Sequence, residues 1–199
     1  YKYEGQGLSI DLLRKQPHGI DLGPLQSDLP RAIYHADKKI DLSFDYFMAD
    51  LERLNKHFFV NDHTPDDSLV LIGRRHLKTN NSWLHNSQRM VKGTNKGLSR
   101  CTAQMHPQDA SKYDICDKQT ITVTSRVGSI SLPVEITDKI MPGVISIPHG
   151  WGHNKKGMRW QVAQEHAGVS VNDLTDEMVV DELSGNAVLN GVPVTVVGV

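Results

Sequence analysis

The residues from Gly73 to Met90 contain the chain's densest group of side chains that could bind a ligand. Two guanidinium groups and an imidazole, Arg74, Arg75 and His76, directly follow the apolar run 68–73. Donors and acceptors on uncharged side chains come next, at Asn80, Asn81, Ser82, Trp83, His85 and Asn86. Guanidinium groups suit phosphates or conjugated rings, and amides both donate and accept hydrogen bonds. The inventory favours recognition of a large polar ring system, with a ligand-free surface loop as the alternative.

A second candidate site is the stretch "PHGWGH", which places His149 and His153 four residues apart. On a helix this spacing would put both imidazoles on one face, as in zinc hydrolases. One proline and two glycines in six residues disfavour a helix. We therefore predict a turn whose histidine hydrogen-bonds locally, and keep a zinc-dependent hydrolase as a rival hypothesis.

Residues arranged for catalysis are not evident in the sequence. It lacks the G-x-S-x-G nucleophile motif, the phosphate-binding G-x-x-x-x-G-K-[ST] motif, and a G-x-G-x-x-G between a strand and a helix. The acidic residues of "NDLTDEMVVDELSG", at Asp173, Asp176, Glu177 and Asp181, have helical spacing, so we predict a solvent-exposed helix face there. Cys101 and Cys116 are too few for an iron–sulfur or structural zinc site. We assign no catalytic and no metal-binding residue.

The elements that would position these side chains are mainly short strands. Six apolar runs separated by polar turns lie at 68–73, 99–105, 120–125, 128–137, 143–148 and 193–199. This pattern predicts a compact β-barrel or sandwich. Pro107, followed by Gln108 and Asp109, predicts one short helix between the second and third runs. Gly128 predicts a tight reversal between the third and fourth.

Residues 1–66 have a different character and are predicted to be a connector with one helix. Turn-forming residues dominate 15–32. In the segment 43–58, Phe44, Phe47, Met48, Leu51 and Leu54 recur at three- and four-residue spacing, which predicts a helix of about three turns. The expected organisation is therefore a connector, 1–66, and a β domain, 67–199.

Composition limits the classes of partner. The formal net charge is −1 and 38% of the residues are hydrophobic, which gives no indication of nucleic-acid binding. The longest apolar runs are far shorter than the roughly 18–20 residues of a membrane span. The chain begins at Tyr1 without a methionine, so we expect it to be part of a longer protein, and the missing targeting signal therefore does not indicate its compartment. We expect a cytoplasmic rather than a periplasmic location.

Four motifs in order carry a family resemblance: "LIGRRHLKTNNSWLHN", "MHPQDASKYDICDKQTITVTSRVGSISLPVEITDKIMPGVISIPHGWGH", "VSVNDLTDE" and "DELSGNAVLNGVPVTV". Together they resemble the C-terminal dinucleotide-binding domain of the molybdopterin oxidoreductases, the family of formate dehydrogenases, nitrate reductases and dimethyl sulfoxide reductases. The resemblance covers about residues 68–199. It implies a mainly β fold with short helices, a six-stranded double-psi β-barrel.

The resemblance also implies a ligand, bis(molybdopterin guanine dinucleotide) with molybdenum or tungsten. The cofactor-binding residues it implies are Arg74, Arg75, His76, Asn80, Ser82, Trp83, His85 and Asn86 in the first loop, with His149, Gly150, Trp151, Asn172 and Asp173 further on. The metal's protein ligand and a 4Fe–4S cluster would belong to the N-terminal and central domains of the same polypeptide.

The parent protein would then be a two-electron oxidoreductase, formate dehydrogenase-like, with an electron-transfer partner that the sequence does not identify. Redox chemistry would belong to the metal, so the chain alone is not expected to be catalytic. A barrel that serves as a binding or interaction module without a pterin is the alternative hypothesis.

Overall fold

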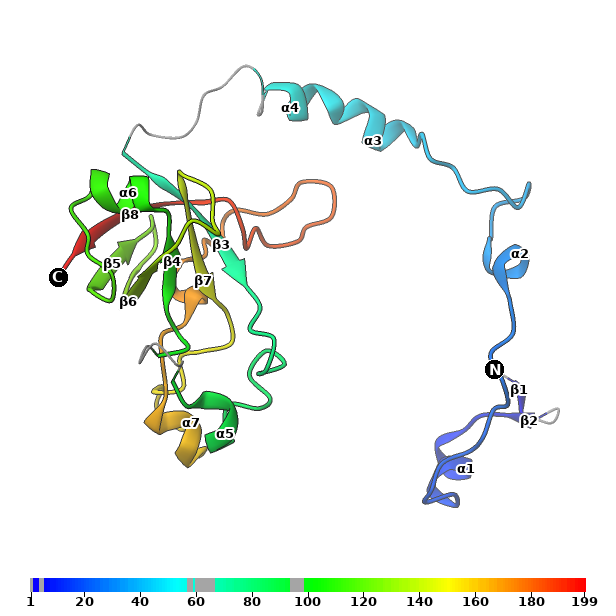
Figure 1. The fold of residues 1–199 in the computed structure, drawn as a ribbon. Coiled ribbons are helices and arrows are strands. Elements are labelled where there is room, and N and C mark those ends of the chain that lie inside the picture. Colours follow the sequence, from blue (N-terminus) through cyan, green and yellow to red (C-terminus); the bar gives the residue numbers. More distant parts are fainter. Residues whose placement is uncertain (1, 4–5, 57–58, 60–66, 94–98) are drawn as a thin grey trace. The chain divides into compact units, whose positions relative to one another are not determined.

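The computed structural model describes residues 2–3, 6–56, 59, 67–93 and 99–199 (Figure 1). By their internal contacts they divide into two units, Tyr1–Leu51 and Glu52–Val199. In these described parts of the chain, every helix is too short or too polar to cross a membrane.

A closed six-stranded barrel forms the body of the second unit (Figure 1). The order of strands around the barrel is β3-β7-β4-β6-β5-β8. Their bounds are β3 Leu69–Arg74, β4 Ala103–Met105, β5 Thr120–Thr124, β6 Ser129–Ile136, β7 Val144–Pro148 and β8 Val192–Gly198. Each predicted apolar run overlaps one of these strands. The predicted mainly β fold with short helices and a six-stranded barrel is confirmed.

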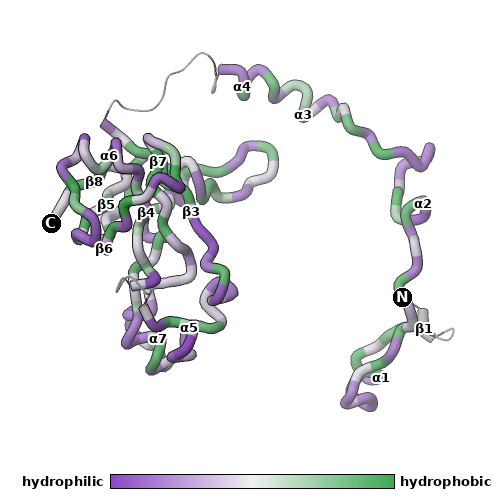
Figure 2. Tube along the Cα trace, in the orientation of Figure 1, coloured by the Kyte–Doolittle hydropathy of each residue, from purple (hydrophilic) through white to green (hydrophobic). Residues whose placement is uncertain are grey.

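The barrel interior is the hydrophobic core. Side chains alternate along each strand, so β5 buries Ile121 and Val123 completely while its threonines face outward. The β8 strand alternates in the same way with Val192, Val194 and Val196. Figure 2 shows hydrophobic residues recurring along the barrel strands. The large buried cluster draws all its members from Leu69 to Val196, so the barrel supplies its own core.

The parallel pairing of β3 with β7 determines where the polar loops lie. In this pair Val70 is opposite Val144 and Arg74 is opposite Pro148. Parallel strands end at the same edge, so the loop after Arg74 and the turn after Pro148 leave the barrel side by side. The pairing continues one step beyond β7, because the His149 backbone N–H donates to the Arg74 carbonyl at 3.0 Å. Two segments about 70 residues apart in sequence are thereby brought together.

Short helices connect the strands, and two predicted local features are confirmed. The helix α6, Pro107–Lys112, has proline in its first turn, and the His106 side chain caps it by accepting from the Gln108 N–H. Gly128 lies in the reversal between β5 and β6, where an added Cβ would meet the Asp173 carbonyl oxygen at 2.3 Å. The remaining helices of this region are α5 Gln88–Val91, α7 Gln161–Glu165 and the 3-10 helix η2 Val171–Leu174.

The predicted acidic helix is wrong. Only Val171–Leu174 is helical, and the chain then turns back on itself through the isolated bridge between Val180 and Ala187. The acids instead make contacts outside a helix: Asp176 accepts from the Met178 N–H and pairs with Arg126, 50 residues away, and Asp181 accepts hydrogen bonds from the Ser184 backbone and hydroxyl. Asp and Ser commonly favour such turns over helix interiors, and here this preference outweighs the helical spacing.

The predicted single helix of the connector is also corrected. The structure has two short helices in that segment, α3 Asp45–Ala49 and α4 Leu51–Asn55, separated at Asp50. The first unit, which ends at the first residue of α4, also contains β1 Lys2–Tyr3, β2 Gln6–Gly7, α1 Ile10–Arg14 and α2 Leu29–Ala32. No residue of this unit whose burial is described is buried. Helices this short gain too few backbone hydrogen bonds to be stable alone. The division at residues 66 and 67 stays a prediction.

Candidate functional site

A polar pocket of about 620 Å³ opens where β3 and β7 end. Its wall comes from five segments: the end of β3, the loop that follows it, the turn after β7, η2 with the residue after it, and the residues before β8. The lining residues are Gly73, Arg75, Asn81, His149, Gly150, Val171, Asn172, Thr175, Leu189 and Asn190. Small-molecule sites commonly have volumes of roughly 300–1,000 Å³. The pocket is therefore large enough for a substantial part of a nucleotide-sized ligand.

Close backbone contact holds the pocket wall together. Gly150 has φ +89°, and a Cβ built there would lie 2.9 Å from both the carbonyl carbon and oxygen of Asn81. Only glycine meets both requirements without strain. On the opposite side, the Gly73 N–H donates to Asn190 Oδ1 at 2.7 Å, which fixes the segment before β8 against the end of β3.

Four of the predicted site residues line this pocket: Arg75, His149, Gly150 and Asn172. Arg75 and Asn172 are exposed, and His149 and Gly150 are half-buried. The sequence had placed these residues in three separate motifs. Because the barrel is closed and β3 pairs with β7, the motifs meet at one end of the fold.

Arg74 is a structural brace in the barrel wall. Its Nη1 donates to the Ser146 carbonyl at 3.1 Å, and its Nη2 donates to the Thr102 carbonyl at 2.8 Å. Burial lowers the pKa of the Arg74 guanidinium, with Glu135 opposing that effect. The guanidinium therefore ties β7 and the start of β4 to the end of β3, and it does not line the pocket.

The rest of the first loop forms a series of turns beside the pocket. Half-buried His76 faces the Arg100 guanidinium at 3.2 Å, and burial with the nearby positive charges lowers the His76 pKa. Asn80 has a left-handed backbone, φ +44°, and the Ser82 carbonyl accepts from the His85 N–H at 3.1 Å. Asn86 Oδ1 accepts from the Ala163 N–H at 3.3 Å, which docks α7 against the loop.

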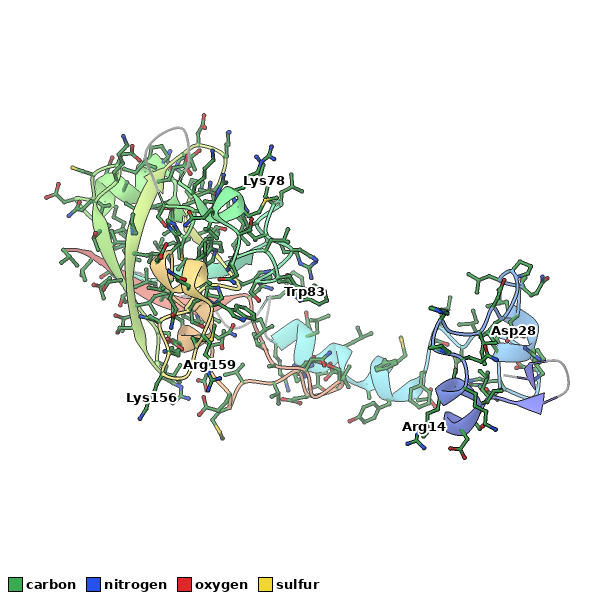
Figure 3. The ribbon with its side chains drawn as sticks, turned by 90° about the horizontal axis from the view of Figure 1, so that it is seen from below. Arg14, Asp28, Lys78, Trp83, Lys156 and Arg159 are labelled. Carbon is green, nitrogen blue, oxygen red and sulfur yellow. The ribbon has the colours of Figure 1, made fainter. Side chains whose placement is uncertain are left out.

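Trp83 projects from this loop into solvent with 80% of its surface exposed (Figure 3). Figure 3 shows Trp83 and Lys78 at the margin of the barrel unit. An indole in this position offers a flat apolar face for stacking.

Two other predicted site residues are buried against each other. His85 is 0% exposed and stacks on Trp151, with ring centroids 4.0 Å apart and an interplanar angle of 31°. His85 Nδ1 lies 2.7 Å from Nε2 of His153, which is also buried. The prediction of a local hydrogen bond is therefore wrong for His153, whose ring instead bonds to the first loop, 68 residues away in sequence.

Burial lowers the pKa of His85 to about 4, and the neighbouring His153 and His76 contribute to the shift. Burial also lowers the pKa of His153. Both rings are therefore neutral near pH 7.

The last predicted residue, Asp173, is exposed and pairs with Lys155 at 2.9 Å. Six pocket residues were absent from the predicted set: Gly73, Asn81, Val171, Thr175, Leu189 and Asn190. Asn81 could have been included, since it lies within the polar loop. Asn190 precedes Gly191 at a turn, which marks a loop but gives no sign that the loop meets the end of β3.

The histidine arrangement does not favour the zinc hydrolase hypothesis. Only His153 of the two proposed ligands is in the buried pair, whereas His149 faces the polar pocket. Within the described residues, no group of three or more His, Cys, Asp or Glu side chains is placed to hold a metal ion.

Comparison with known proteins agrees with this architecture. Residues 69–193 match the model of the molydopterin dinucleotide binding domain. The chain is 27% identical over 106 residues to a tetrathionate reductase subunit from Salmonella typhimurium, a match that covers 45% of this chain and 10% of that protein. Its fold resembles acetylene hydratase from Pelobacter acetylenicus with a TM-score of 0.51 and 18% identity, over 75% of this chain and 19% of that one.

The chain thus spans only a small part of each relative's length. The matched family model nevertheless extends over the whole barrel, from the start of β3 into β8, and includes every residue that lines the pocket. The chain belongs to the molydopterin dinucleotide binding domain family.

Proposed function

We propose that the pocket at the ends of β3 and β7 binds the dinucleotide portion of a molybdopterin cofactor within a larger molybdenum- or tungsten-dependent oxidoreductase. The observation that carries the proposal is the lining of the pocket, with one guanidinium, three amide side chains, a hydroxyl and an imidazole around a glycine-edged opening. Family membership supports the identity of the ligand.

The chemistry of the lining residues fits such a ligand. The Arg75 guanidinium can form paired charge-assisted hydrogen bonds to a pyrophosphate. Asn81, Asn172 and Asn190 offer donors and acceptors that can match the polar edge of a guanine or pterin ring. The absence of a side chain at Gly150 allows the Asn81 backbone to approach the turn after β7, which brings Asn81 to the pocket.

The role of these residues would be to bind and orient. When bound, the cofactor would supply two-electron redox chemistry at its metal, and the protein would supply position and electrostatics. Other domains of the same polypeptide would complete the enzyme. A formate dehydrogenase-like activity, a 4Fe–4S cluster and a cytoplasmic location stay predictions. The two relatives are named for different reactions, so we propose no substrate.

The first test is the composition of the full-length parent. Elemental analysis should find molybdenum or tungsten, and mild acid hydrolysis should release about two guanine nucleotides per metal if the cofactor is the bis form. Absence of both metals and of guanine, in a host that makes the cofactor, would instead support a binding module without a pterin.

A second test assigns the pocket. GDP, as a probe of the nucleotide end, should bind the 199-residue chain, and Arg75→Ala should weaken that binding about tenfold or more in calorimetry because a charged hydrogen-bond pair is lost. Arg159→Ala is the matched control, since Arg159 is exposed and does not line the pocket (Figure 3). Equal affinities for the two variants would place the nucleotide elsewhere.

A further inference from the structure

Two buried imidazoles join the loop after β3 to the turn after β7. His85 belongs to the first segment and His153 to the second, and their facing nitrogens, Nδ1 and Nε2, lie 2.7 Å apart. The rings meet nearly edge to face, with centroids 4.9 Å apart and an interplanar angle of 82°. Both residues are at least nine-tenths buried. Neither side chain lines the pocket, but each lies within four residues of a residue that does.

Stacking and backbone hydrogen bonds connect this histidine pair to the two sides of the pocket. Trp151 stacks on His85, and it immediately follows Gly150, which touches the Asn81 backbone. The Leu84 N–H donates to the Thr79 carbonyl at 3.2 Å, so the stretch that carries Asn81 is closed into a turn just before His85. On the other side, the Gly152 and His153 N–H groups both donate to the Ala167 carbonyl. Displacement of either imidazole would therefore shift one side of the pocket relative to the other.

The hydrogen bond between the two rings forms only if one of the two facing nitrogens carries a proton and the other does not. A neutral imidazole carries one N–H and one bare nitrogen. If His85 has its proton on Nδ1, then His153 Nε2 must be bare and His153 also has its proton on Nδ1. If His85 Nδ1 is bare, both rings have their protons on Nε2. The two rings must therefore adopt the same tautomer, since opposite tautomers would face two N–H groups or two lone pairs.

The groups around the pair disfavour protonation of either ring to an imidazolium. His85 faces His153 and the more distant His76, and His76 itself is near Arg74, Lys78 and Arg100. The Gly150 carbonyl acts in the opposite direction on both rings. Trp160 lies beyond His153, with ring centroids 6.2 Å apart. His85 Nε2 is buried without a hydrogen-bond partner, so an imidazolium at His85 would bury an unpaired charged donor.

We propose that His85 and His153 are positioning residues, whose mutual hydrogen bond holds the Asn81 side of the pocket against the Gly150 side. The identity of the ligand in this pocket rests on the proposed function, but the coupling of the two loops does not. The pair acts on the ligand only through the backbone that it positions, and the barrel strands do not depend on it.

Matched substitutions test this coupling by amide hydrogen exchange on the 199-residue chain. His153→Leu removes the hydrogen bond, whereas His153→Gln offers a side-chain donor and acceptor in the same place. We expect the Leu84 and His85 amides to exchange at least tenfold faster in His153→Leu and at near wild-type rates in His153→Gln. Amides of the barrel, such as Leu71 and Ile147, should be unchanged in both. Wild-type protection of the loop in His153→Leu would overturn the proposal.

A measurement on the unaltered chain decides the question even if His153→Leu fails to fold. Long-range proton–nitrogen correlation spectra report the tautomer and charge of each histidine ring. At pH 7 we expect His85 and His153 both neutral and in the same tautomer. Opposite tautomers, or an imidazolium at either ring, would overturn the proposal.

The same samples separate this inference from the proposed function. If the loop amides and tautomers behave as expected and GDP nevertheless fails to bind, the ligand assignment is wrong while the positioning role stands. If GDP binds equally well to wild type and His153→Leu with unchanged loop protection, the positioning role is wrong while the ligand assignment stands.

Discussion

At the scale of single residues, two adjacent arginines have different roles. Arg74 is the last residue of β3 and directs its guanidinium across the barrel wall to Ser146 and Thr102. Arg75 follows the strand and is exposed at the pocket. Sequence alone treats the pair alike, because both offer the same group directly after an apolar run. The difference arises from side-chain alternation and from which carbonyls neighbouring strands present.

Lysine substitution should distinguish the two arginines. Arg74→Lys should lower the free energy of unfolding by about 1–2 kcal/mol, because one ammonium cannot replace the guanidinium fork that reaches two carbonyls. Arg75→Lys should change it by less than about 0.5 kcal/mol, as is usual for an exposed side chain. Urea denaturation at pH 7.5 measures both. Equal losses would contradict the bracing role of Arg74.

The depressed pKa of His85 gives the barrel a defined dependence on pH. The unfolded ring titrates near the ordinary value of about 6.5, whereas the folded ring has a pKa of about 4. Below pH 6.5 the unfolded state therefore binds a proton that the folded state does not, and stability falls as pH falls. From pH 7.5 to pH 5 the loss attributable to His85 should be about 2 kcal/mol.

Urea unfolding of wild type and His85→Phe at the two pH values tests this dependence. The variant should lose stability at pH 7.5 but show a shallower decline with falling pH, because the titrating ring is gone. Parallel pH profiles for the two proteins would show that His85 is not the titrating group responsible.

At the scale of elements, the site depends on two segments that meet without side chains between them. Gly150 in the turn after β7 lies against the backbone of Asn81 in the loop after β3. The chain contains a matched control, because Gly157 has a similar φ of +94° but nothing within 4 Å of an added Cβ. Substitution of these two glycines in turn separates the free-energy cost of a strained backbone from the cost of losing the close approach of the two loops.

Alanine at these two glycines should therefore have unequal effects. Gly157→Ala should cost about 1 kcal/mol from the left-handed backbone alone. Gly150→Ala should cost about 2–4 kcal/mol, because the methyl group also displaces the Asn81 backbone. Thermal or urea unfolding measures the difference. A cost at Gly150 no larger than that at Gly157 would show that the loops can separate freely.

At the scale of the whole molecule, the two units differ in how they are stabilised. The barrel buries a contiguous hydrophobic cluster drawn only from Leu69 to Val196. In the first unit, large apolar side chains such as Phe44, Tyr46, Phe47 and Met48 are each at least half exposed. Hydrophobic burial is the dominant favourable term in folding, so the barrel should account for nearly all of the cooperative stability.

Removal of residues 1–51 tests that division. The truncated chain should unfold at the same urea midpoint as the full chain, within experimental error, since the buried cluster is retained. Circular dichroism in the far ultraviolet should lose only a small helical contribution. A marked drop in the midpoint would mean that the first unit stabilises the barrel.

Short-range patterns in the sequence were sufficient to predict most of the local elements of the barrel. The six strands followed from alternating or continuous apolar runs, the start of α6 from Pro107, and the reversal at Gly128 from its lack of a side chain. The polar loop after β3 and the "PHGWGH" turn were recognised as binding candidates from their residue types, and the family from their order.

Which of those candidate residues come together depends on long-range strand pairing, which the sequence patterns do not reveal. The pairing of β3 with β7 brings Arg75 beside His149 and turns Arg74 into a brace, while Asn190 arrives from the segment before β8. The same long-range contacts bury His85 against His153. Local spacing contains no information about partners 68 to 117 residues away, and those partners determine whether a polar side chain is a ligand, a brace or a buried hydrogen-bond partner.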